Sequence, residues 1–73
     1  AEVLDVGCGN GVISRSLGAN GFNVKGIDIS EKTIAKAKLL NTYSNVSFEV
    51  CSAEQLVASG KKYHAVICSE VLE

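Results

Sequence analysis

Three glycines alternate directly after a short apolar run, and they constrain this chain more than any other feature. The segment at residues 3–11 reads VLDVGCGNG, so an apolar strand pattern breaks into Gly7, Gly9 and Gly11. Glycine alone lets a backbone turn so tightly and lets a ligand approach the main chain closely. A helix pattern follows at once, so we expect unpaired N–H groups and a positive dipole end beside the loop. The segment therefore predicts a loop that binds a nucleotide-type cofactor.

Apolar periodicity predicts alternating strands and helices along the chain. The expected strands are 2–6, 23–27, 46–50 and 63–68, and the expected helices are 11–20, 31–40 and 53–58. Ile13 and Leu17 should face the core from the first helix, and Ile34, Ala37 and Leu40 from the second. Crossovers of helix length make the strands parallel, which predicts an α/β fold with a Rossmann-like, doubly wound sheet.

Size and composition limit the domain and its partners. The chain has 73 residues, a hydrophobic share of 47% and a net charge of −1, which gives no electrostatic sign of nucleic-acid binding. A sheet buried on both faces normally needs more chain than this. We therefore expect residues 1–73 to be the N-terminal, cofactor-binding part of a single domain, with the remaining strands and the substrate-binding part absent. Three cysteines without a CxxC pair favour a reducing compartment.

The loop departs from the dinucleotide fingerprint at one position. A G-x-G-x-x-G pattern that starts at Gly7 would need a third glycine where Val12 stands. Asp28 ends the second strand, 21 residues after Gly7, where a carboxylate can accept hydrogen bonds from both ribose hydroxyls. The structural alternative is that Asp28 caps the next helix, although Ser30 is itself a competent N-cap. The pattern favours a ribose contact and disfavours an NAD-dependent oxidoreductase.

These segments resemble the first two motifs of the class I S-adenosylmethionine-dependent methyltransferases. The matching stretches are DVGCGNG at 5–11 and GIDIS at 26–30, and the resemblance covers essentially the whole chain as the first half of that domain. It implies that Gly7 and Gly9 line the methionine moiety, that Asp28 binds the ribose, and that CSAE at 51–54 flanks the adenine. The cofactor-binding residues that we expect are Asp5, Gly7, Cys8, Gly9, Gly11, Asp28, Ile29, Ala53, Glu54 and Ser69.

The last segment is similar to a narrower group, the ubiquinone-biosynthesis O-methyltransferases. It reads AVICSEVLE at 65–73, and in that group a histidine follows at the next position. Glu70 and Glu73 are three residues apart, so they share a face of a helix. The resemblance implies that the two carboxylates bind a divalent cation, Mg²⁺ or Zn²⁺. The alternative is a pair of solvated carboxylates that complement a helix dipole.

The resemblance implies an enzyme that transfers a methyl group from S-adenosylmethionine to a catechol-type hydroxyl of a polyprenylated ubiquinone precursor. The alternatives are a class I methyltransferase for another small molecule or a macromolecule, and a non-catalytic S-adenosylmethionine-binding module. No residue here is assigned as the catalytic base. The expected partner is a small prenylated phenol or catechol, with no nucleic acid, and we expect peripheral membrane association of the full-length protein and a biosynthetic complex. The implied location is the matrix face of the mitochondrial inner membrane in a eukaryote, or the cytoplasm of a bacterium.

Two side-chain types give weaker signals. The cysteines follow or end predicted strands, at the ligand-binding edge of such sheets, although packing accounts for them adequately. We hypothesise only that Cys8 and Cys68, on adjacent strands, become protected from alkylation when cofactor binds. His64, the single histidine, should lie at the opposite edge as a surface or packing residue.

Overall fold

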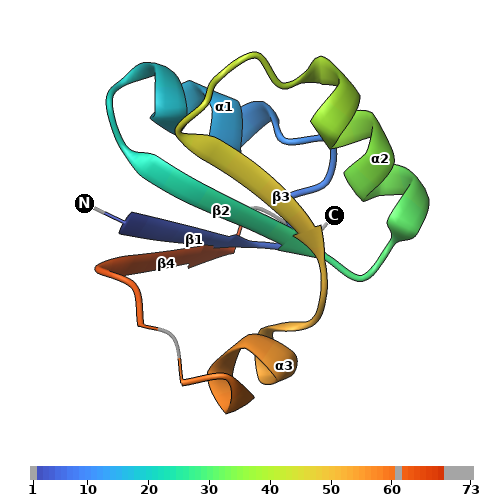
Figure 1. The fold of residues 1–73 in the computed structure, drawn as a ribbon, viewed down its shortest axis with the longest axis vertical. Helices are drawn as coiled ribbons and strands as arrows, with labels where there is room; N and C mark the ends of the chain where they lie inside the picture. The colour runs from blue at the N-terminus through green and yellow to red at the C-terminus, as the bar shows by residue number, and fades with distance from the viewer. Residues whose placement is uncertain (1, 61, 69–73) are drawn as a thin grey trace.

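The computed structural model describes residues 2–60 and 62–68, and it contains each of the strands and helices expected within those residues (Figure 1). A further helix, expected to begin near Ser69, lies outside the described residues. In chain order they are β1 (Glu2–Val6), α1 (Val12–Ala19), β2 (Asn23–Asp28), α2 (Glu31–Leu40), β3 (Val46–Val50), α3 (Ala53–Ala58) and β4 (Ala65–Cys68). The largest difference in bounds is the start of β4, which we expected at Tyr63. Since Ala65 pairs with Val3 near the start of β1, the ladder begins only there.

The four strands form one parallel sheet in the order β3-β2-β1-β4, which confirms the predicted fold class. The chain winds outward from β1 through β2 to β3 and then returns to the other side of β1 for β4 (Figure 1). This reversal makes the gap between β1 and β4 a topological switch point. Open α/β sheets bind ligands at such points, outside the carboxyl ends of the strands.

Helices lie on both faces of the sheet and divide the core in two. α1 and α2 cover one face, and α3 covers the other (Figure 1). Because side chains alternate between the faces along each strand, Val3 belongs to one cluster and its neighbour Leu4 to the other. The cluster under α1 and α2 consists of Val3, Cys8, Val24, Ile34, Ala37, Val46 and Phe48, and the cluster under α3 consists of Leu4, Ile27 and Leu56.

The buried face of α1 differs from the expected one. Ser14 and Gly18 are buried, whereas Ile13 is 42% exposed and Leu17 is half-buried. The reason lies at Gly18, because a Cβ there would stand 2.1 Å from Cγ2 of Val46. The helix therefore approaches the sheet along its small residues, and the prediction that Ile13 faces the core was wrong.

The buried face of α2 was predicted correctly except at its end. Ile34 and Ala37 are buried, but Leu40 is 41% exposed. The next inward position after Ala37 is taken by Asn41, whose Nδ2 donates a hydrogen bond to the carbonyl of Val46 at 2.9 Å. A polar side chain thus closes the end of the helix where we expected an apolar one.

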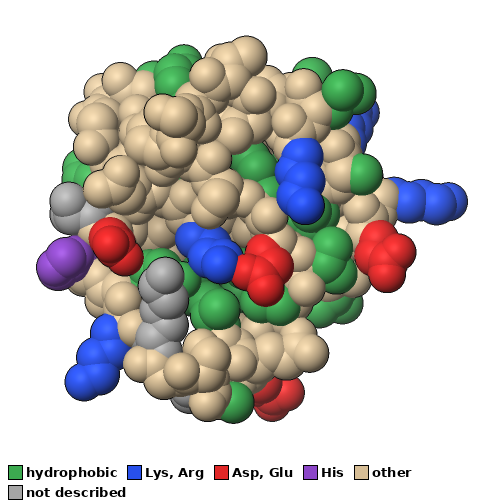
Figure 2. Space-filling view, in the orientation of Figure 1, with side chains coloured by type: hydrophobic (Ala, Val, Ile, Leu, Met, Phe, Trp, Pro, Cys, Tyr) green, Lys and Arg blue, Asp and Glu red, His purple; other side chains and the backbone are tan. Residues whose placement is uncertain are grey.

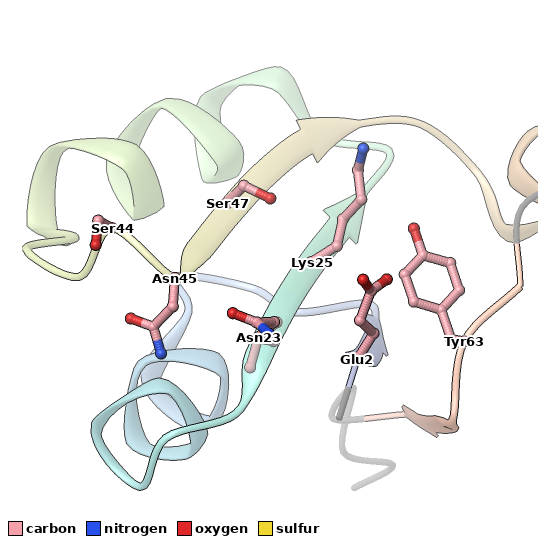
Figure 3. Close-up of a pocket in the computed structure, with 8 residues that line it drawn as sticks. Glu2, Asn23, Lys25, Ser44, Asn45, Ser47 and Tyr63 are labelled. Atoms are coloured by element: carbon pink, nitrogen blue, oxygen red, sulfur yellow. The ribbon is translucent and has the colours of Figure 1, made fainter.

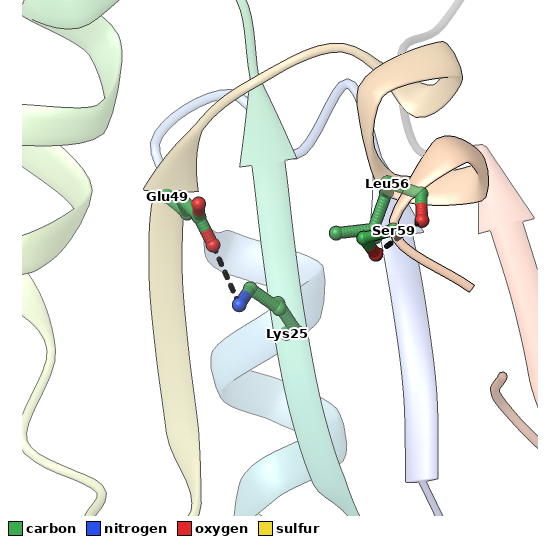
Figure 4. Close-up of polar contacts among 4 residues, drawn as sticks. All are labelled: Lys25, Glu49, Leu56 and Ser59. Carbon is green, nitrogen blue, oxygen red and sulfur yellow. Dashed lines mark hydrogen bonds and ion pairs between the residues drawn. The ribbon is translucent and has the colours of Figure 1, made fainter. Parts of the chain in front are cut away.

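Surface polar contacts contribute little to the stability of the fold. Figure 4 shows the ion pair between Lys25 Nζ and Glu49 Oε1 at 2.6 Å, which joins β2 to β3, and the hydrogen bond from Ser59 Oγ to the Leu56 carbonyl at 2.6 Å, which closes α3. The ion pair is partly exposed, so it contributes at most about 1 kcal/mol. The two apolar clusters therefore carry most of the stability.

The visible surface has no strong charge asymmetry. Figure 2 shows basic and acidic side chains interspersed over one face, with no large patch of a single sign. Among the described residues, no helix is long and apolar enough to span a membrane.

Candidate cofactor site

The loop between β1 and α1 turns at three left-handed residues, as the glycine pattern predicted. The φ angles of Gly7, Gly9 and Gly11 are 69°, 59° and 85°, a region that side chains rarely adopt. The loop follows the carboxyl end of β1, beside the switch point. Its position is therefore the one at which this sheet topology binds ligands.

The N–H groups of the loop mostly bind acceptors of the chain itself. Gly7 and Cys8 donate to the carbonyl of Ile27 at 2.9 and 3.0 Å, and Gly11 donates to the carbonyl of Cys8 at 3.0 Å. The Gly9 N–H donates to a carboxylate oxygen at 3.2 Å. The expectation that the loop offers unpaired N–H groups is thus wrong for these four. A pyrophosphate cradle uses such donors, and these four N–H groups are already bound within the chain.

That carboxylate belongs to Asp28, which ties the loop to the start of α2. Its Oδ2 accepts the hydrogen bond from Gly9, and its Oδ1 accepts one from the N–H of Ser30 at 3.0 Å. Ser30 is the N-cap of α2, as predicted, because its Oγ accepts from the N–H of Thr33 at 3.3 Å. Each oxygen of a carboxylate has a second lone pair. Asp28 can therefore hold the loop and still accept hydrogen bonds from ribose hydroxyls.

Gly9 and Gly11 have different surroundings. A Cβ at Gly9 would meet no atom within 4 Å, so the backbone there faces open space. A Cβ at Gly11 would stand 2.5 Å from Cζ of Phe48, so this residue packs against the core. Gly9 thus offers the surface for close approach by a ligand, and Gly11 supports the loop from beneath.

A hollow of about 140 Å³ opens beside the loop at the carboxyl ends of the strands. Ile29, 78% exposed, stands at its edge and offers an apolar side chain to a flat ring. Three separate connections of the chain meet there. The lining residues are Val6, Gly7, Ile27, Asp28, Ile29, Cys51, Ser52 and Ala53. Of the expected cofactor residues, the structure thus brings Gly7, Asp28, Ile29 and Ala53 together.

Other expected residues lie apart from this hollow. Asp5 is fully buried, and Glu54 is exposed in the first turn of α3. Ser69 and the two expected metal ligands, Glu70 and Glu73, lie outside the described residues. Within residues 2–60 and 62–68, no three His, Cys, Asp or Glu side chains gather as a metal site would require.

The thiol of Cys8 is held neutral beneath the loop. Burial, together with the nearby carboxylates of Asp5 and Asp28, raises its pKa to about 12. Only the thiolate reacts readily, so Cys8 should resist alkylation with or without cofactor. Cys51 lines the hollow and is the better candidate for protection by a ligand, although burial raises its pKa as well. Cys68 ends β4, as expected, and its side chain is exposed.

The single histidine lies at the far edge of the sheet, as predicted. The N–H of His64 donates to the carbonyl of Glu2 at 2.9 Å, and its ring Nδ1 accepts from the N–H of Glu2 at 3.0 Å. These bonds join the segment before β4 to the start of β1. These two hydrogen bonds give His64 a structural role, and no catalytic role is needed to account for it.

Three residues that support the loop were not anticipated. Ser14 Oγ donates to Oδ2 of Asp5 at 2.5 Å, and Arg15 Nε donates to the carbonyl of Gly11 at 3.2 Å. Phe48 fills the space behind the loop. The sequence held one signal for Ser14. A serine on the buried face of a helix needs a hydrogen-bond partner, and the carboxylate in the preceding strand could supply it.

Comparisons with known proteins decide the family. A family model described as a methyltransferase domain matches residues 3–73. The chain belongs to this methyltransferase domain family. It is 45% identical over 75 residues to the ubiquinone biosynthesis O-methyltransferase of Dechloromonas aromatica, which covers 99% of this chain and 32% of that protein. It is 40% identical over 74 residues to the enzyme of the same name from Nitrosomonas europaea, covering 97% of this chain and 32% of that protein.

A solved methyltransferase structure shares the fold of this chain. The magnesium protoporphyrin IX methyltransferase of Synechocystis PCC 6803, with bound S-adenosylmethionine, matches with a TM-score of 0.81 and 39% identity. The match covers 96% of this chain and 35% of that one. The chain thus spans about a third of the length of these relatives. Relatives named for different acceptors resemble the chain to a similar degree, so the similarity shows the methyltransferase family and not the acceptor.

Proposed function

We propose that the protein is an S-adenosylmethionine-dependent O-methyltransferase that acts on a catechol-type hydroxyl of a polyprenylated ubiquinone precursor. The observation that carries the cofactor part is the left-handed glycine loop after β1, which the Asp28 carboxylate joins to the end of β2 through the Gly9 N–H. The acceptor part is supported by the names of the curated relatives and by the resemblance of residues 65–73.

The described residues fit this cofactor in shape and charge. In this proposal Asp28 accepts hydrogen bonds from the ribose, the adenine occupies the hollow beside Ile29 and Ala53, and the methionine part lies at Gly9. The support is that Asp28, Ile29 and Ala53 line one hollow and that Gly9 faces open space. Beneath the loop, one buried oxygen of Asp5 has no hydrogen-bond partner among the described residues, which suits a cationic ligand. S-adenosylmethionine carries an activated methyl group on its sulfonium, so the main task of the protein is to position donor and acceptor.

The proposal includes a divalent cation at Glu70 and Glu73. Its support is the resemblance alone, because both residues lie outside the described part of the chain. When bound, such a cation polarises a catechol oxygen and lowers the pKa of its hydroxyl. The test is dialysis of the intact protein against EDTA. Methyl transfer that falls and returns with added Mg²⁺ or Zn²⁺ supports the cation, and unchanged transfer contradicts it.

The cellular setting is also part of the proposal. Peripheral association with a membrane and a biosynthetic complex follow from a water-insoluble prenylated substrate. The location is then the mitochondrial inner membrane in a eukaryote or the cytoplasm of a bacterium. Fractionation of cells that produce the intact protein tests this.

Two measurements on the intact protein test the function. Calorimetry should show binding of S-adenosylhomocysteine and no binding of NAD, and the reverse result would favour an oxidoreductase. Incubation with S-adenosylmethionine and a prenylated catechol should yield the mono-methyl ether. Cofactor binding without methylation of the catechol would favour a methyltransferase for another acceptor or a non-catalytic binding module.

A further inference from the structure

The turn between β3 and α3 forms one wall of the hollow at the carboxyl ends of the strands, and a reciprocal pair of hydrogen bonds holds it. The Ser52 N–H donates to Oε1 of Gln55 at 2.8 Å, and the Gln55 N–H donates to Oγ of Ser52 at 3.2 Å. This arrangement is a capping box, in which each side chain binds the backbone of the other residue. Ser52 and Ala53 line the hollow, whereas Gln55 is exposed and does not line it.

α3 is the shortest of the described helices and has the most complete cap. It has only six residues, Ala53–Ala58, which is far below the roughly 12–15 that a helix needs to persist alone in water. α1 has no side-chain cap. In α2, Ser30 Oγ accepts from the Thr33 N–H, but the Ser30 N–H donates to Asp28 outside the helix. The reciprocal cap thus supports the helix that has the least stability of its own.

Two further contacts attach the turn to the rest of the domain. The Cys51 N–H donates to the carbonyl of Asp28 at 3.1 Å, which ties the turn to the end of β2. Leu56 is buried in the core cluster under α3, and its N–H donates to the carbonyl of Ser52 at 3.3 Å. Between these two anchors, the Gln55 side chain fixes the backbone of Ser52.

We infer that Gln55 is a positioning residue, which holds Ser52 and Ala53 in place as the wall against which the adenine of S-adenosylmethionine packs. The inference rests on the proposed function and deepens it, because it names a residue that serves only the base of the cofactor. Gln55 lies outside the hollow, so it acts through Ser52. Without its side chain, the Ser52 N–H loses its acceptor and the first turn of α3 frays, so ligand binding must first reorder the wall.

The test is calorimetry of the intact protein with S-adenosylhomocysteine. In Gln55→Ala, which keeps a high helix propensity but lacks the acceptor, the Kd should rise about fivefold. Gln55→Glu keeps an acceptor oxygen and completes the same capping box, so its Kd should stay within about twofold of the wild-type value. Ser59→Ala is the matched control, because Ser59 Oγ donates to the Leu56 carbonyl at 2.6 Å at the other end of the same helix. That variant should leave the Kd unchanged.

A ligand without adenine separates a role at the base from a general effect on the fold. S-ribosylhomocysteine keeps the ribose and the homocysteine part of S-adenosylhomocysteine, and NMR titration can measure its weaker binding. Gln55→Ala should leave the Kd for this ligand unchanged, and it should weaken adenosine about as much as S-adenosylhomocysteine.

Three results would overturn the inference: an unchanged Kd for S-adenosylhomocysteine in Gln55→Ala, an equal loss for S-ribosylhomocysteine, or an equal loss in Ser59→Ala. Thermal unfolding shows which variants are folded, and if Gln55→Ala is not, Gln55→Met carries the same comparison. Failure of the wild-type protein to bind S-adenosylhomocysteine would instead overturn the proposed function.

Discussion

Two hollows lined by described residues lie at opposite ends of the sheet, and the larger of these two is not at the proposed site. The hollow at the amino ends of the strands measures about 240 Å³, against about 140 Å³ at the carboxyl ends. Figure 3 shows the larger hollow, where Glu2 and Lys25 project from β1 and β2 and Tyr63 projects from the segment before β4. The carboxyl-end hollow is instead bordered by the turn at Gly7 and by Asp28.

The comparison indicates that the direction of the strands is a better guide to the ligand site than the volume of a hollow. At the amino ends, the hollow lies between long polar side chains on one face of a sheet, including the ion-paired Lys25. At the carboxyl ends, the strand order reverses between β1 and β4, and the glycine loop brings backbone to the surface. A ligand can be held there by main chain and by a few convergent polar groups.

The largest effect on stability is expected at the floor of the carboxyl-end site. Gly11→Ala should lower the free energy of unfolding by about 3 kcal/mol, because the Cβ strikes the Phe48 ring and φ stays at 85°. Gly60→Ala is the matched control, since Gly60 also has a positive φ but faces open space. Urea unfolding should show a loss of only about 1 kcal/mol there. Equal losses would mean that Gly11 does not support the loop through packing.

The largest effect on binding is expected at Gly9. Gly9→Val should weaken S-adenosylhomocysteine binding roughly a hundredfold or more, because the side chain fills the space where the ligand approaches. Gly21→Val has the same kind of φ and the same open surroundings, but it lies at the amino end, before β2. Calorimetry should show unchanged affinity for that control. Equal weakening in both variants would break the distinction between the two ends of the sheet.

Asp28 should show a smaller effect on the same measurement. Asp28→Ala should cost about 1–3 kcal/mol of binding free energy for S-adenosylhomocysteine, since it removes the ribose acceptor and frees the Gly9 N–H. Normal affinity would refute the ribose assignment. Adenosine, which keeps the ribose, should lose affinity in the same proportion.

Alkaline pH should reveal the neutral thiol beneath the loop. The pKa of Cys8 rises from an ordinary 9.0 to about 12 in the folded protein. The neutral Cys8 thiol therefore contributes fully to the free energy of unfolding below pH 9. This contribution is lost as the pH rises toward 12, because the thiol ionises at lower pH in the unfolded state than in the folded state. Cys8→Ala should flatten the fall of unfolding free energy between about pH 9 and pH 10.5, and Cys68→Ala should not. An unchanged slope in Cys8→Ala would show that the thiol is not held neutral.

The smallest effect is expected in the amino-end hollow. Lys25→Met should change the free energy of unfolding by less than about 1 kcal/mol, because the ion pair with Glu49 is partly exposed. Affinity for S-adenosylhomocysteine should not change. A clear fall in affinity would show that the larger hollow takes part in cofactor binding after all.

Most of the fold was predictable because its signals are local. Each strand and helix shows its period within a few residues, and parallel order follows from the helical crossovers between strands. The need for glycine in the loop and the position of Asp28 after β2 are local as well. The buried faces of the helices were harder to predict. Ile13 and Leu40 fit the apolar period but are exposed, because Gly18 packs against the sheet in α1 and Asn41 closes the end of α2.

The glycine loop shows where local information ends. From the amino-acid sequence came its place between strand and helix, its left-handed turns and its spacing to Asp28, since these depend on neighbours in the chain. Only the tertiary structure decided that its N–H groups bind Ile27 and Asp28, that Gly11 rests on Phe48, and that Ser14 holds Asp5. Those contacts join residues on different elements, and packing of the elements selects them. The shape of the loop follows from that packing.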